Sequence, residues 1–150
     1  MSSIVDYDQV TEENKGIVLQ EWLDRLTVLV DLVEGWVKDL GWATRRISKR
    51  MEDSRLGTYR APALIMQRDL VQIALEPIGR FAPRCDGVVD LYLMPALDDM
   101  ASLYYENGEW HLHYMFDGSP TVSTMRDAEE MTLTRHVLTR VLDELVAHGA

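Results

Sequence analysis

The stretch MASLYYENGEWHLHYMF, residues 100–116, decides the fold, because it sets the register of two neighbouring strands. Asn107-Gly108 stands between two runs in which apolar and polar residues alternate, and this is the strongest short signal of a β-hairpin. With these two residues in the turn, Ser102 lies opposite His113, and a slip by one residue would bury the charged side chains. The side chains expected to face the core are Leu103, Tyr105, Trp110, Leu112, Tyr114 and Phe116.

The whole chain, residues 1–150, predicts a single domain with a helix near each end. Apolar residues at helical spacing predict a long helix over residues 11–40 and a second helix over residues 132–147. Gly41 follows the first helix as a C-terminal stop. Residues 1–10 are expected to be flexible, because they come before the first patterned element.

Between the helices, turn residues and period-two patterns predict five or six antiparallel strands that form a meander. The fold class is therefore α+β, with the long N-terminal helix and the C-terminal helix packed on one face of the sheet. Segment 44–52 is open to two interpretations. On a strand, Ile47 and Met51 would point inward and Arg46 and Arg50 outward, but the spacing of four also fits a short helix.

The other face of the sheet is expected to be open to solvent or to a partner. Methionine and tyrosine on that face suit adaptable contact with a polypeptide. The sequence therefore predicts a non-catalytic protein- or peptide-binding module, such as an adaptor, a chaperone-like protein or a regulator, without a cofactor. The predicted binding face comprises Asp90, Tyr92, Met94, Met100, Ser102, Tyr104, His111, His113 and Met115.

The acidic balance, the size and the helix–sheet–helix layout resemble small bacterial chaperones of secretion systems, which bind unfolded segments as dimers. The resemblance is one of architecture and carries no residue across to this chain. Those folds usually interrupt the sheet with a middle helix, whereas the connection over residues 77–87 is too short here for a substantial one.

His111 and His113 support an alternative, because two imidazoles one residue apart share a face of a strand, as in some metal sites. Catalytic zinc takes about three protein ligands and structural zinc about four, and Asp90 is the partner that the pattern offers. The alternative is therefore a small metal-binding protein or a hydrolase centred on His111, His113 and Asp90, with Ser102 as a candidate nucleophile. The sequence contains no glycine-rich phosphate loop and no His-Glu-x-x-His helix to support an enzyme.

The charge balance restricts the partners. Fifteen basic and 25 acidic residues give a formal net charge of -10, which argues against nucleic acid or an anionic membrane as a partner. The basic run RRISKR is the exception, and it predicts either an anion contact or a solvated edge strand. The candidate anion contacts are Arg45, Arg46, Lys49 and Arg50.

Val28 and Leu32 fall on the side of the first helix opposite its core stripe. They are candidate contacts of a homodimer. The single cysteine, Cys85, allows no internal disulfide and favours a reducing compartment. The start of the chain lacks a signal-peptide pattern, and no apolar run approaches the roughly 20 residues of a membrane helix. The expected location is the cytoplasm.

Overall fold

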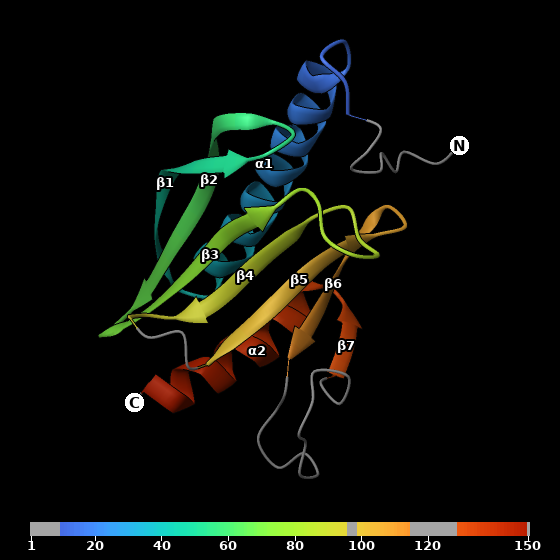
Figure 1. Ribbon diagram of the computed structural model, residues 1–150. Coiled ribbons are helices and arrows are strands. Elements are labelled where there is room, and N and C mark those ends of the chain that lie inside the picture. Colours follow the sequence, from blue (N-terminus) through green and yellow to red (C-terminus); the bar gives the residue numbers. More distant parts are fainter. Residues whose placement is uncertain (1–9, 96–98, 115–128, 150) are drawn as a thin grey trace.

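The structure is a computed structural model that describes residues 10–95, 99–114 and 129–149. Within these ranges the chain has the predicted α+β fold, with one antiparallel sheet whose strands follow each other in chain order (Figure 1). Phe116, Met115 and most of residues 1–10 lie outside the described residues. The elements are α1 (Lys15–Asp39), β1 (Ala43–Asp53), β2 (Gly57–Arg68), β3 (Val71–Gly79), β4 (Val88–Leu93), β5 (Met100–Glu106), β6 (Glu109–Tyr114), β7 (Glu129–Thr132) and α2 (Arg135–Gly149).

The sheet has seven strands, slightly more than the predicted five or six. Segment 44–52 lies within β1, so the strand interpretation is confirmed and the helix interpretation is wrong. The strand missing from the prediction is β7, which has four residues. Four residues are too few to show a clear alternation of polar and apolar side chains, and α2 follows almost at once.

Both helices cover the same face of the sheet, as predicted. α1 packs against β1 and β2, and α2 packs against β3 and β4 (Figure 1). Their apolar sides share one core with the inner face of the sheet. None of the described helices combines the length and the apolarity that crossing a membrane requires. Fully buried core side chains include Trp22, Leu26, Leu64, Met66, Ile73, Leu91, Leu103, Leu112 and Leu138.

The hairpin of β5 and β6 has the predicted register, with Ser102 opposite His113. Asn107 and Gly108 have positive φ angles of 51° and 81°, as a type I′ hairpin turn requires. The turn thereby directs the apolar side chains of both strands towards the core, where Leu103, Trp110, Leu112 and Tyr114 are buried. The sorting of the two faces from the sequence is confirmed for the described part of this hairpin.

The first helix begins at Lys15, four residues after the predicted start at Thr11. Thr11 instead forms a turn with Asn14, whose backbone N–H donates to Thr11 Oγ1 at 3.2 Å. In return, the Thr11 N–H donates to Asn14 Oδ1 at 2.7 Å. These reciprocal bonds resemble those of a capping box and fix the chain as it enters the helix. The predicted stop is confirmed, because Gly41 has a φ of +91°.

The outer half of the β1–β2 hairpin, residues 49–61, forms an arm that extends past the part of β2 paired with β3 and packs against α1 (Figure 1). β2 pairs with β3 only over residues 64–68, so the arm is free to bend away. Trp22 of α1 donates from Nε1 to the Tyr59 hydroxyl at 3.0 Å, and both residues are buried. The arm therefore adds its own contacts to the core instead of extending the flat part of the sheet.

The bend explains why the predicted faces of β1 are only partly right. Met51 is buried as expected, but Ile47 is 37% exposed. Arg46 was expected to point outward, yet it pairs with Leu64 on the helix side of the sheet and binds Glu34 of α1 at 2.7 Å. The side chains of Ile47 and Met51 point to the same side of β1. Met51 lies beyond the bend, where this side faces the core, whereas Ile47 lies before it.

Candidate functional site

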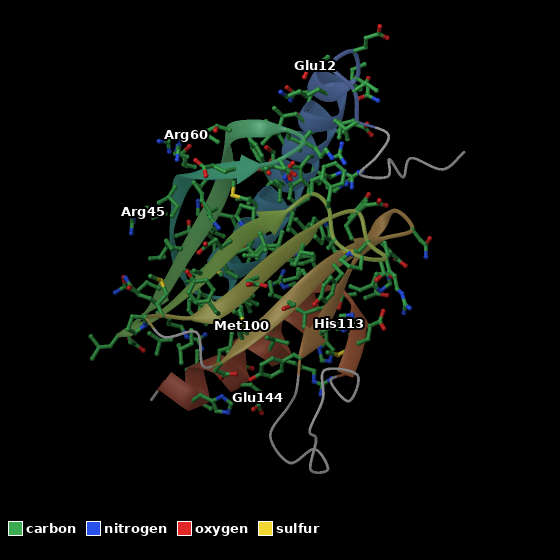
Figure 2. The ribbon with its side chains drawn as sticks, in the orientation of Figure 1. Glu12, Arg45, Arg60, Met100, His113 and Glu144 are labelled. Carbon is green, nitrogen blue, oxygen red and sulfur yellow. The ribbon has the colours of Figure 1, made fainter. Side chains whose placement is uncertain are left out.

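The face of the sheet turned away from both helices, called the open face here, carries most of the predicted binding residues (Figure 2). They lie on β4, β5 and β6 because side chains alternate along each strand. The register brings together the described residues Asp90, Tyr92, Met100, Ser102, Tyr104, His111 and His113, all of them half-buried. Met94 lies just beyond β4, and Met115 is outside the described residues.

A row of polar side chains crosses the open face at right angles to the strands. Successive strand pairings place Glu76 beside Asp90, Asp90 beside Ser102, Ser102 beside His113 and His113 beside Glu130. We call these five residues the polar row. Its middle three members belong to the binding face predicted from the sequence, whereas Glu76 and Glu130 were not in that predicted set. Glu130 was missed because β7 was not predicted.

Glu76 is the best-held carboxylate of the polar row. Lys49 reaches it across β2, with 2.5 Å between Nζ and Oε1, and Tyr92 donates from its hydroxyl to Oε2 at 2.6 Å. Burial alone would raise the pKa of Glu76, but the bonds from Lys49 and Tyr92 outweigh burial and lower this pKa. The bond to Glu76, together with burial, raises the pKa of Tyr92 to about 12. Tyr92 is therefore a fixed hydrogen-bond donor at neutral pH.

Asp90 lies in the middle of the row and is less well compensated. Burial raises its pKa, the hydroxyl of Ser102 opposes this shift, and the charge of Glu76 adds to it. Ser102 donates to Asp90 Oδ1 at 3.3 Å. A serine nucleophile has to give its proton to a base such as histidine. The Ser102 proton is directed to Asp90 instead, so this arrangement gives no support to a serine hydrolase.

The two histidines share an acidic neighbour, but it is Glu130 and not the predicted Asp90. Glu130 Oε1 lies 3.6 Å from His111 Nδ1 and 3.8 Å from His113 Nε2. Tyr104 packs its ring edge-on against His113, with 4.8 Å between the ring centroids. Within the described residues, no three histidine, cysteine or acidic side chains are grouped so that they could hold a metal ion. Glu130 is thus a close neighbour of both histidines, Tyr104 is a close neighbour of His113, and all of them lie on the open face.

The basic run of β1 is largely neutralised within the chain. Among the four candidate anion contacts, Arg45 is exposed (Figure 2) and forms no ion pair with the described residues. The others each have a carboxylate partner, which competes with any external anion. The pairs are Arg46 with Asp31 and Glu34, Lys49 with Glu76, and Arg50 with Glu52.

The candidate dimer contacts lie on the outer side of α1. Val28 is 66% exposed and Leu32 is 43% exposed, and Ile17 is exposed on the same side of the helix. Scattered exposed apolar residues are common on protein surfaces. The homodimer expected from Val28 and Leu32 remains a prediction.

Comparison of the chain with models of known families, with curated proteins and with solved structures found no match. The chemistry of the open face is therefore the guide to function. In the described part of the chain, this face distributes hydrogen-bonding groups, aromatic rings and the thioether of Met100 over β4, β5 and β6. Such a spread suits contact with an extended polypeptide better than the attack on a single bond.

Proposed function

We propose that this protein is a non-catalytic binding module that holds a peptide segment of another protein on its open face. One observation carries the proposal. Both helices pack on one face of the sheet, and among the described residues no further layer covers the other face. A face that had only to meet water would be expected to carry mainly charged and small polar residues. This one carries Tyr92, Met100 and Tyr104, half-buried among polar neighbours.

The chemistry of these side chains supports a polypeptide as the ligand. Methionine adapts its shape to different partners, and tyrosine offers a large apolar ring together with a polar end. Tyr92 is already fixed by Glu76, so little of its conformational freedom would be lost on binding. The polar row offers donors and acceptors to the backbone of a peptide that lies across it. These properties support an adaptor, a chaperone-like protein or a regulator.

The proposal can be tested with peptides selected from a displayed random library against the immobilised protein. A selected peptide is then titrated into the double variant Met100→Ser/Tyr104→Ala and into the unchanged protein. We expect the double variant to bind at least about tenfold more weakly, because it removes two apolar anchors from the face. Leu70→Ser is the control, since Leu70 is 97% exposed at the turn between β2 and β3. Equal affinity of the double variant and the control would contradict the proposal.

A further inference from the structure

A second site lies outside the open face, between the outer side of α1 and the turn that joins β5 to β6. A cavity of about 420 Å³ opens there, within the size range of small ligand sites. α1 and the hairpin both contribute to its walls, so it is a feature of the tertiary fold. The residues that give it its character are Glu21, Asp24, Arg25, Tyr105, Glu109 and Trp110.

The aromatic part of the cavity is rigid. Tyr105 and Trp110 are cross-strand partners, and their rings meet edge to face with centroids 5.1 Å apart. The Arg25 guanidinium lies 4.1 Å from the centre of the Tyr105 ring. Arg25 also donates from Nη1 to the backbone oxygen of Asp86 at 2.8 Å. Arg25 is thus held in the wall and is not free to turn towards the acidic rim.

The rim of the cavity carries an excess of negative charge. Glu21 and Asp24 lie on α1, and Glu109 lies across from them on the hairpin. Among the described residues Glu21 and Asp24 form no ion pair, although Asp24 accepts a hydrogen bond from Gln20 at 2.8 Å. Glu109 lies 3.6 Å from His111 Nε2. Three carboxylates against one guanidinium leave the lining of the cavity with a formal charge of −2.

We propose that this cavity takes a lysine or arginine side chain presented by a polypeptide partner. The apolar stem of such a side chain would pack against Val28 and Trp110, which both line the cavity. Its cationic head would lie between the carboxylates of α1 and Glu109. An anion would be repelled by the same carboxylates, and the net charge of -10 on the chain attracts cations over a longer range. The inference goes beyond the proposed function and does not require that the open face bind anything.

Two short peptides distinguish the contribution of charge to binding from the contribution of side-chain shape. Ac-Gly-Gly-Arg-Gly-Gly-NH2 carries the cation, and the same peptide with citrulline in place of arginine has nearly the same shape without the charge. Each is titrated into ¹⁵N-labelled protein at low salt and followed by NMR. We expect the arginine peptide to shift the Trp110 indole and the Gly108 amide, with an affinity at least about fivefold above that of the citrulline peptide. Added salt should reduce this difference, because exposed charge pairs are screened.

A charge-neutralised variant tests the carboxylates themselves. Glu21→Gln/Asp24→Asn should weaken binding of the arginine peptide by about three- to tenfold, since each exposed ion pair contributes modestly. The control is Glu12→Gln/Glu13→Gln, which removes the same charge from exposed positions before α1 begins (Figure 2). Equal binding of the two peptides, or an equal loss in both variants, would overturn the inference. Shifts confined to open-face residues such as Ser102 would overturn it as well, but would leave the proposed function standing.

Discussion

Tyr92 and Glu76 lie diagonally across β4 and β3, and the tyrosine hydroxyl donates a 2.6 Å hydrogen bond to the carboxylate. Lys49 holds the other oxygen of the same carboxylate. The open face therefore contains a network in which Lys49, Glu76 and Tyr92 hold one another in place. Such order is useful for recognition, because groups that are already fixed lose less freedom when a partner binds.

The bond between Tyr92 and Glu76 predicts a pH-dependent effect of Tyr92→Phe. At pH 7 the variant should lose about 1–2 kcal/mol of unfolding free energy, because a charged acceptor loses its donor. The folded-state pKa of Glu76 is lowered below its ordinary value of 4.5. The stability that depends on the ionised form is thus present above the unfolded pKa and is lost as the pH falls through the folded pKa. Urea unfolding should therefore show a smaller loss of unfolding free energy for Tyr92→Phe at about pH 3.5 than at pH 7.

The control for this prediction is Tyr104→Phe. Among the described residues the Tyr104 hydroxyl makes no hydrogen bond, and the ring contact with His113 is kept. We expect the unfolding free energy of this variant to stay within about 0.5 kcal/mol of the original protein. A similar loss in both tyrosine variants would contradict the role given to Glu76.

Lys49→Met tests the other half of the network. Removing the ammonium leaves the half-buried Glu76 charge with one donor fewer, and the unfolding free energy should fall by about 1 kcal/mol. In Lys49 and Glu76 both side chains are 28% exposed, whereas the pair of Arg50 and Glu52 is 61% and 68% exposed. Arg50→Met should therefore change the stability very little. If chemical denaturation gave the two variants the same loss, Lys49 would have no special part in the face.

Two glycine substitutions are expected to change the stability in opposite directions. Gly87 is in close contact with Trp22 of α1, whereas Gly35 has open space around it. A Cβ at Gly87 would lie 2.4 Å from the Trp22 ring, whereas a Cβ at Gly35 would meet no atom within 4 Å. Gly87→Ala should lower the unfolding free energy by about 1–3 kcal/mol or more through overpacking. Gly35→Ala should raise it by about 0.5–1 kcal/mol, because alanine is the better helix former. Thermal unfolding that moves both variants in one direction would refute this packing.

The geometry of the histidine pair predicts that the protein does not retain stoichiometric zinc. His111 and His113 share only Glu130 as a close acidic neighbour among the described residues, at 3.6 and 3.8 Å. A stable zinc site needs three or four protein ligands that converge on one point, and among the described residues no three histidine, cysteine or acidic side chains are grouped in that way. Elemental analysis of protein purified without a histidine tag should find well under one metal ion per chain. A stoichiometric metal that disappears in His111→Ala/His113→Ala would restore the metal-binding alternative.

Local signals predicted much of this fold. Asn107-Gly108 determined the register of the hairpin, and Gly41 marked the end of α1, because both positions need a backbone conformation that glycine or asparagine adopts readily. Alternation then separated the two faces of β4, β5 and β6. These features depend on residues that are close together in the sequence, so a local sequence pattern can predict them.

The features that the sequence did not predict depend on distant contacts. Ile47 was assigned to the core because alternation cannot show that β2 leaves β3 and bends towards α1. Glu130 was missed because β7 is too short to be recognised. The link between Lys49 and Glu76 crosses an intervening strand, and no local pattern indicates such a reach. The sequence could therefore sort the predicted binding residues onto one face of the sheet, but it could not assign their contacts with distant segments of the chain.

The most direct test of the central claim is a cross-saturation experiment on the labelled protein bound to a selected peptide. Saturation of the peptide protons transfers only to protein atoms in contact with it. The proposed function predicts transfer to the Met100 methyl group and to the backbone amides of Tyr92, Ser102 and Tyr104 on the open face. Transfer confined to the exposed side of α1 or to α2, with none to β4 and β5, would contradict it.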